Sequence, residues 1–322
     1  MAGREAIQRM KSMREAVHQG GGDKRVEQQH EKGKHTARER LDVLLDDHSL
    51  TEHQTYMYGR ATFFGLEDKR LPGDGVVTGS GLVDGRQVFC SSQDFTVLGG
   101  SLGEKHAERI AEAQELSVRT GTPFVQINDS GGARIQEGIL SLHGYARIFR
   151  ANTLASGVVP QISVILGPCA GGAVYSPGIT DFVFMVDNLS NMYITGPDVI
   201  RAVTGEEISH EELGGAAAHA SRSGVAHFRF ADEDACMAGV RRLLSYLPSN
   251  NREQPPMIGA DSPDWDDPDR RVPEVLDIVP EEEKRGFDIR EFIGVVFDFE
   301  SFMEVHADYA KNVVTGFARL GG

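Results

Sequence analysis

Apolar residues near the start of the chain recur at helical spacing among many charged ones. Residues 3–19 show this pattern and are followed by three glycines, which predicts an exposed amphipathic helix that ends there. A second helix is predicted from Thr36, a good N-cap, with Glu39 completing a capping box. The apolar residues of this helix share one face: Leu41, Leu44 and Leu45. Both segments are too polar for core helices, so we expect them to pack on a neighbour or subunit.

From Gly75 onward the pattern changes to short apolar runs separated by longer amphipathic segments. Two runs, 76–83 and 87–90, flank Asp84-Gly85, which is typical of a β-hairpin. Predicted helices and strands then alternate: a helix over 102–119, a strand over 124–127, a helix over 139–155, a strand over 161–166, short strands over 182–186 and 192–195, and a helix opened by Pro197. This alternation predicts an α/β protein with a parallel sheet and crossover helices.

The last quarter of the chain has a different composition. Residues 248–286 are rich in Pro, Asp and Glu, which predicts a linker or an extended surface arm. A helix is predicted from Asp288 through Val296. Residues 315–322 resemble the start of a further strand.

Charge and cysteine content exclude several classes of protein. The chain has 322 residues, of which 33 are basic and 48 acidic, for a net charge of −15 at pH 7. Such acidity argues against nucleic acid or an anionic membrane as a partner, although a local group of Lys and Arg can still bind a phosphorylated ligand. Cys90, Cys169 and Cys236 form no CxxC pair, which excludes a zinc ribbon and suits a reducing compartment. Without a signal-peptide pattern or a run of about 20 apolar residues, we expect a soluble cytoplasmic protein.

Two glycine pairs follow neighbouring predicted strands, each ahead of a segment that can be helical. Gly131-Gly132 lies in NDSGGAR (128–134), and Gly171-Gly172 lies in GPCAGGA (167–173). Paired glycines let a ligand approach the backbone and leave N–H groups free to point at it. Two such turns side by side would stabilise an oxyanion without any acidic or nucleophilic side chain. Neither pair fits the GxGxxG or GxxxxGK[ST] nucleotide motifs.

Side chains near the glycine pairs are weaker candidates. Ser130 and Ser176 are the obvious nucleophiles, but Ser130 is not in a GxSxG elbow and no histidine stands at a telling spacing. Turn capping is the favoured role of Ser130, and packing is the favoured role of Cys169. His143 is interpreted as a surface histidine.

The charged side chains near the pairs leave more than one interpretation open. Asp129 and Glu137 are interpreted as acceptors that brace the first loop rather than as an acid–base pair. Five cations are candidates for phosphate contact: Arg134, Lys32, Lys34, Arg38 and Arg40. From charge alone, the segment from Lys32 to Arg40 is better explained as a solvated helix end.

Longer motifs together resemble one known family. They are HEKGKHTARER (30–40), LPGDGVVTG (71–79), QDFTVLGGS (93–101), NDSGGARIQEG (128–138), SGVVPQISVILGPCAGGAVYSP (156–177), ITGPDV (194–199), ELGGA (212–216), YAKN (309–312) and GFAR (316–319). By these motifs, which span nearly the whole chain, the sequence resembles the β (carboxyltransferase) subunit of biotin-dependent acyl-CoA carboxylases. The resemblance is to the N-terminal half of the propionyl-CoA and methylmalonyl-CoA carboxyltransferase group.

The resemblance implies a crotonase-like fold, a superhelix of ββα units with an N-terminal helical extension. The implied division is a helical extension over 1–50, a crotonase-like carboxyltransferase N-domain over 51–250, an acidic Pro-rich arm over 251–286, and a helix with the start of a link to a missing C-terminal half over 287–322.

The resemblance also implies an activity. The family moves a carboxyl group from carboxybiotin, held on a partner protein, to the α-carbon of a short acyl-CoA such as propionyl-CoA or acetyl-CoA. This chain would bind the acyl-CoA and would be inactive without a biotin-binding half from an opposing subunit. The implied partners are a biotin carboxylase or biotin carrier subunit and further copies of the chain, which form hexamers in the family. No metal is implied.

Site residues carry over from the family position by position. The family's oxyanion-stabilising pair maps onto Gly171 and Gly172, and the physical argument above adds Gly131 and Gly132. The expected acyl-CoA contacts flank these pairs or come from the N-terminal segment: Ala133, Arg134, Ala170, Ala173, Lys34 and Arg38.

The chain departs from the family in three respects. It ends where the second half would begin, His143 occupies a position where the family tends to have a small residue, and it lacks the four-cysteine ribbon of the bacterial two-gene acetyl-CoA carboxylase β subunit. Three other functions stay open. They are the carboxyltransferase of a biotin-dependent decarboxylase, a non-catalytic CoA-thioester-binding subunit, and a crotonase-like hydrolase or serine peptidase.

Overall fold

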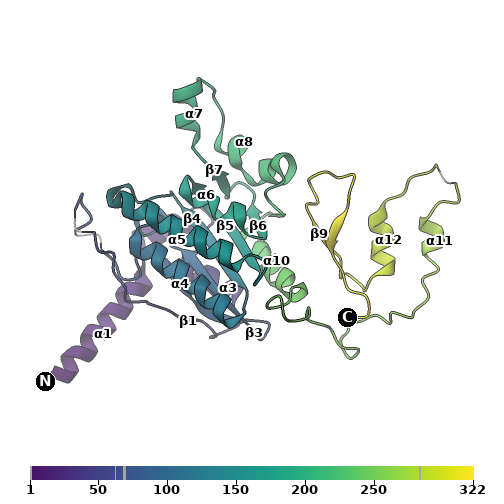
Figure 1. The fold of residues 1–322 in the computed structure, drawn as a ribbon, viewed down its shortest axis with the longest axis horizontal. Coiled ribbons are helices and arrows are strands. Elements are labelled where there is room, and N and C mark those ends of the chain that lie inside the picture. Colours follow the sequence, from purple (N-terminus) through teal and green to yellow (C-terminus); the bar gives the residue numbers. More distant parts are fainter. Residues whose placement is uncertain (1, 62, 68–69, 283) are drawn as a thin grey trace.

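A large mixed sheet lies between two layers of helices, and helix α1 and the C-terminal segments extend from this core (Figure 1). The computed structural model describes residues 2–61, 63–67, 70–282 and 284–322.

The strands of the large sheet are β1 (Thr51–Glu52), β2 (Val76–Val83), β3 (Arg86–Gln93), β4 (Phe124–Ser130), β5 (Gln161–Ala170), β6 (Phe182–Val186), β7 (Asn191–Tyr193) and β8 (Phe228–Phe230). The helices are α1 (Ala2–Gln19), α2 (Asp23–His30), α3 (Ala37–Leu44), α4 (Glu104–Thr120), α5 (Ile139–Ala155), α6 (Gly172–Tyr175), α7 (Pro197–Thr204), α8 (His210–Gly214), α9 (Ala216–Ala218), α10 (Glu233–Tyr246), α11 (Val275–Ile278) and α12 (Ile289–Val296).

The topology of the large sheet is that of an α/β protein with an antiparallel edge. The strand order is β1-β2-β3-β4-β5-β6-β8, with β7 paired to the end of β5. β1, β2 and β3 are antiparallel neighbours, and the pairs from β3 to β8 are parallel. The β2–β3 hairpin turns at Asp84 and Gly85, whose φ angles of 50° and 77° suit a type I′ turn. The predicted hairpin, the parallel sheet and its crossover helices are confirmed.

Each face of the sheet is covered by its own helices. Leu41 and Leu44 of α3 are fully buried on one face, in a cluster with side chains of α10 and the strands. Ile110 of α4 and Ile148 of α5 are buried on the other face. The expectation that the helix after Thr36 is too polar for the core is therefore wrong. Helix α3 packs into its own chain because its buried cation, Arg40, has carboxylate partners.

The N-terminal segment contains one more helix than the sequence predicted. Helix α1 and the capping box of α3 are confirmed: Thr36 Oγ1 accepts from the Glu39 N–H at 3.3 Å, and Glu39 Oε2 accepts from the Thr36 N–H at 2.7 Å. Helix α2 was not predicted, because Val26 is its sole aliphatic residue and no apolar period marks it.

The C-terminal segment follows the predicted order of elements. Within the described part of residues 251–286, α11 is the sole helix or strand. Asp288 caps α12 by accepting from the Arg290 N–H at 2.9 Å, and β9 (Met303–Val305) pairs with β10 (Thr315–Phe317). The division into parts at residues 50, 250 and 286 stays a prediction. In the part of the chain that the structure describes, none of the helices has the length and apolar character needed to cross a membrane.

Candidate active site

The two glycine turns lie at the carboxyl ends of adjacent parallel strands. β4 and β5 are in register up to the pair Asn128–Ile165, and the next pair is Ser130–Cys169. One residue of β4, Asp129, therefore faces three residues of β5, numbers 166–168. This bulge offsets the two turns while keeping them at the same edge of the sheet. The prediction that the glycine pairs follow neighbouring parallel strands is confirmed.

The two turns also approach each other closely. A Cβ atom added to Gly132 would lie 2.8 Å from the carbonyl oxygen of Ala170, and Gly132 has a φ of 99°. A side chain at position 132 would therefore meet both a steric and a conformational barrier. Glycine is needed here so that the first turn can lie against the second.

The backbone N–H groups of the two turns differ in their availability. Gly131 donates to the Gly99 carbonyl at 3.1 Å and Gly132 donates to Ser130 Oγ at 3.1 Å, so the expectation of free donors at this pair is wrong. In the second turn, Gly171 donates to the Tyr193 carbonyl at 3.2 Å. Among the described residues, the N–H groups of Gly172 and Ala173 meet no acceptor. The unpaired donors therefore stand at the start of α6.

Gly171 holds the backbone in a conformation that directs these donors. Its φ and ψ are 60° and −127°, a combination that L residues rarely adopt. Gly138, which precedes α5, has nearly the same angles, 54° and −126°. The backbone counterpart of Gly171 in the first loop is thus Gly138 rather than a member of the Gly131-Gly132 pair.

A cavity of about 340 Å³ adjoins the first turn. Its lining includes Phe95 and Leu98, together with Gly99, whose carbonyl accepts from Gly131. Two cations from the N-terminal segment, Arg25 and Lys32, also line it, and within the described structure neither forms an ion pair with a carboxylate. A basic cavity with an apolar wall suits an anionic ligand that carries an apolar group.

Four of the five predicted cations are instead engaged in ion pairs, Arg40 among them, whereas Lys32 lines the cavity. Arg134 is 3% exposed and pairs with Asp74 at 2.6 Å and Glu137 at 2.8 Å. Arg38 pairs with Glu52 at 2.8 Å, and Lys34 pairs with Asp129 at 2.6 Å. Burial lowers the pKa of Lys34, an effect that the neighbouring carboxylate opposes. The expected ligand contact through the Arg134 side chain is therefore not supported, because its guanidinium is already used inside the protein.

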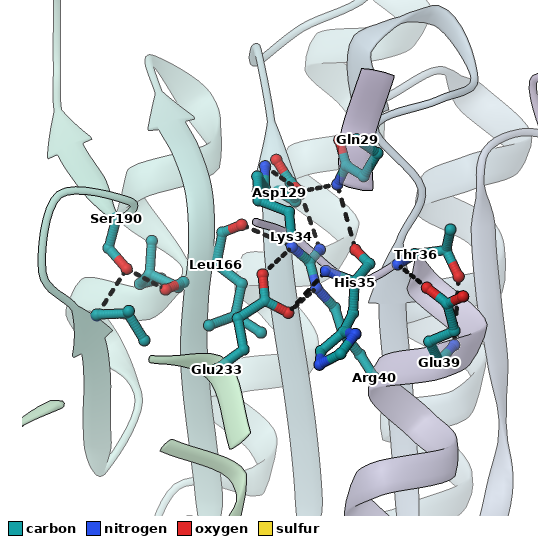
Figure 2. Close-up of polar contacts among 12 residues, drawn as sticks. Gln29, Lys34, His35, Thr36, Glu39, Arg40, Asp129, Leu166, Ser190 and Glu233 are labelled. Carbon is teal, nitrogen blue, oxygen red and sulfur yellow. Dashed lines mark hydrogen bonds and ion pairs between the residues drawn. The ribbon is translucent and has the colours of Figure 1, made fainter. Parts of the chain in front are cut away.

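Behind the first turn lies a buried cluster of charged side chains (Figure 2). Arg40 Nη1 donates to Asp129 Oδ2 at 2.9 Å, and its Nη2 donates to Glu233 Oε1 and to the Leu166 carbonyl, each at 2.8 Å. Lys34 and the amide of Gln29 also contact Asp129 Oδ2. Asp129 is thus an acceptor that braces the loop, as predicted. So is Glu137, which accepts from the Glu104 N–H at 2.7 Å.

The candidate nucleophiles have neutral hydrogen-bond partners among the described residues. Ser176 Oγ donates to Asn152 Oδ1 at 2.9 Å, within a buried network of amide side chains that includes Gln161 and Gln114. Ser130 Oγ accepts from Gly132, and neither hydroxyl contacts a histidine in the described structure.

The structure agrees with the interpretations of Cys169 as a packing residue and His143 as a surface histidine. Burial raises the pKa of the Cys169 thiol, which agrees with a packing role. His143 is exposed on α5. No group of three His, Cys, Asp or Glu side chains among the described residues has the arrangement of a metal site.

The sequence profile of the carboxyl transferase domain family matches residues 28–322, so the chain belongs to this family. It is 52% identical over 318 residues to the propionyl-CoA carboxylase carboxyltransferase subunit of Haloferax mediterranei, covering 99% of the chain and 61% of that protein. It is 54% identical over 306 residues to the methylmalonyl-CoA decarboxylase subunit alpha of Veillonella parvula, covering 95% of the chain and 59% of that protein. The chain thus spans about three-fifths of the length of these relatives.

A solved structure shows the same fold. The hexameric transcarboxylase 12S, with methylmalonyl-CoA and methylmalonic acid bound, superposes with a TM-score of 0.93 at 48% identity, covering 98% of the chain and 60% of that protein. The fold is therefore of the crotonase-like carboxyltransferase type that the resemblance implied.

Proposed function

We propose that this chain binds the acyl-CoA during transfer of a carboxyl group from carboxybiotin to the α-carbon of propionyl-CoA or acetyl-CoA. The observation that carries this proposal is the pair of unpaired N–H groups of Gly172 and Ala173, beside a glycine turn, in a member of the carboxyl transferase domain family. The methylmalonyl-CoA in the transcarboxylase 12S structure supports a CoA thioester as the ligand.

The chemistry explains why such donors are needed. Removal of the α-proton of an acyl thioester places negative charge on the thioester oxygen. Two N–H groups fixed by the fold stabilise that charge without having to reorganise, and loss of one such donor costs about 3 kcal/mol in other enzymes. Gly171 fixes the donors. Gly131 and Gly132 shape the opposite wall, and Ala133, Ala170 and Ala173 are the proposed contacts of the acyl group.

The basic cavity is the proposed site for the phosphates of CoA. Arg25 and Lys32 supply positive charge there, and Phe95 and Leu98 supply apolar surface. The cavity touches the first turn through Gly99, so a CoA bound in it could extend its thioester toward α6. Lys32 is one of the cations that the sequence offered for phosphate contact, and Arg25 takes the place of Lys34, Arg38 and Arg134, which pair with carboxylates.

Carboxybiotin on a biotin carrier or biotin carboxylase partner would supply the carboxyl group. The half of the enzyme that binds carboxybiotin is proposed to come from an opposing subunit of a cytoplasmic homo-oligomer. Large apolar side chains exposed near the turns support such a neighbour: Ile135 (86% exposed), Ile139 (75%) and Ile194 (67%).

A second candidate is the carboxyltransferase of a biotin-dependent decarboxylase, which the 54% identity to the methylmalonyl-CoA decarboxylase subunit favours. The same donors would serve the reverse transfer, from a carboxylated acyl-CoA to biotin. Addition of a biotin-side half and a biotin carrier distinguishes the two. Net carboxylation of propionyl-CoA by carboxybiotin supports the first, and net transfer of the carboxyl group from methylmalonyl-CoA to the biotin of the carrier supports the second.

Calorimetric titration of the chain with propionyl-CoA, with free CoA as the control, tests the binding proposal. We expect saturable binding that is tighter for the thioester. Equal affinity for both ligands would place the acyl group outside this chain and favour a CoA-binding subunit without a catalytic role. Absence of binding by a folded chain would refute the proposal that this chain alone carries the acyl-CoA site.

A further inference from the structure

The β-bulge that offsets the glycine turns is occupied by side chains from outside the sheet. At the bulge, Asp129 of β4 stands opposite Leu166, Gly167 and Pro168 of β5. A Cβ atom on Gly167 would overlap Asp129 Oδ1 and would lie 2.6 Å from Lys34 Nζ. The carboxylate of Asp129 therefore fills the space that a side chain on β5 would otherwise take.

Arg40 connects both strands at this point (Figure 2). Its Nη1 contacts Asp129, the residue before the first turn begins, and its Nη2 contacts the carbonyl of Leu166, in the bulge that leads to the second turn. Glu233 of α10 holds the other side of the guanidinium, through Nε at 3.0 Å and Nη2 at 2.8 Å. The side chains of all three charged residues are at most 2% exposed.

We propose that Arg40 is a positioning residue, which sets the offset between the two glycine turns and so aims the N–H groups of Gly172 and Ala173 at the ligand. The planar, forked guanidinium can bond two strands and a helix at once, which a lysine ammonium cannot do with the same geometry. The effect of Arg40 on the ligand rests on the proposed function. Its effect on the two turns does not depend on that function.

The test compares hydrogen exchange and ligand binding in three variants of the full chain. Arg40→Lys keeps the charge but removes the fork. Glu233→Gln loosens the guanidinium with a side chain of the same shape. The matched control is Arg241→Lys, because Arg241 also donates to a backbone carbonyl, Leu44 at 2.8 Å, and pairs with two carboxylates, but far along α10 from the turns.

In Arg40→Lys we expect the hydrogen-bonded amides among residues 129–132 and 166–171 to exchange at least tenfold faster, with little change elsewhere. The preference for propionyl-CoA over CoA should fall about tenfold, the effect of about one lost hydrogen bond, while the affinity for free CoA stays unchanged. Glu233→Gln should show the same pattern at smaller amplitude and carries the test if Arg40→Lys does not fold. Arg241→Lys should leave both turns unchanged.

Three results decide whether Arg40 positions the two turns. Unchanged exchange in either turn, or faster exchange spread evenly over the chain as in a general loss of stability, would overturn the positioning role. Faster exchange in both turns with an unchanged thioester preference would also overturn it. Faster exchange confined to the turns, in a chain whose wild type does not distinguish the thioester from CoA, would support the control of the turns by Arg40 and refute the proposed acyl-CoA function.

Discussion

Replacement of Gly171 by alanine should abolish most of the preference for a thioester at a moderate cost in stability. A Cβ at this position would have open space, since its nearest neighbour is the Ile194 carbonyl oxygen at 3.9 Å. The cost therefore comes from the backbone, whose φ of 60° and ψ of −127° suit glycine and which costs other residues about 1–3 kcal/mol. At about 2 °C per kcal/mol for a protein of this size, the melting temperature should fall by roughly 2–6 °C.

The effect on binding should be larger than this strain alone suggests. Relaxation of the turn would rotate the N–H groups of Gly172 and Ala173 away from the thioester. Two lost hydrogen bonds at about 1 kcal/mol each amount to about 2 kcal/mol, or roughly thirtyfold in affinity. Titrations with propionyl-CoA and with free CoA measure this difference directly, and the affinity for free CoA should hardly change.

Gly138→Ala is the matched control for strain. Gly138 has nearly the same backbone angles, and an added Cβ would meet nothing within 4 Å. This variant should lose a similar amount of stability but keep its preference for propionyl-CoA. The assignment of the second turn would be refuted if Gly171→Ala kept the preference, or if both variants lost it equally.

The charges, a half-buried histidine and the serines give three further predictions. Charge reversal of both Arg25 and Lys32 to glutamate should weaken binding of free CoA about tenfold, since two exposed charge contacts are worth about 1–2 kcal/mol. The melting temperature should fall by only about 2 °C, because Arg25 loses its hydrogen bond to the Thr96 carbonyl. Burial, aided by His306, lowers the pKa of His227 from 6.5 to about 4. As the pH falls, His227 is therefore protonated in the unfolded chain before it is protonated in the folded chain. The stability of the wild type should then fall more steeply between pH 6.5 and about 4 than that of His227→Gln, as thermal unfolding at each pH would show. Ser130→Ala and Ser176→Ala should leave thioester binding intact, and loss of a thioester-hydrolase activity in either would favour the hydrolase interpretation.

Periodicity predicted most of the fold because each element buries one regular face. Helices α4 and α5 and strands β4 to β6 lie close to their predicted bounds, since their apolar positions pack on the sheet. Helix α2 was missed because its sequence carries no apolar period. The burial of α3 was missed because an arginine without known partners, here Arg40, argues against a core position. Those partners, Asp129 and Glu233, are 89 and 193 residues away.

The glycine turns could be predicted from the sequence, but their hydrogen bonds could not. Two glycine pairs after apolar runs indicated adjacent turns, which the strand pairing confirms. Whether an N–H group is free depends on acceptors such as the Gly99 and Tyr193 carbonyls, which the fold brings in from other segments. The partners of the cations could not be predicted from the sequence either. Arg25 lines a cavity with Phe95, 70 positions further along, whereas Arg134 lies beside the first turn in sequence and is enclosed by carboxylates in space.

The two turns are braced by different kinds of chemistry. Carboxylates and cations surround the first, at Asp129 and Arg134, whereas neutral amides anchor the chain beyond the second, through Ser176, Asn152 and Gln161. Protonation of buried carboxylates breaks ion pairs but leaves amide hydrogen bonds intact. Loss of the ion pairs would therefore disturb the donor turn as well, through the bond from Arg40 to the Leu166 carbonyl, while the amide network would still hold the chain beyond α6.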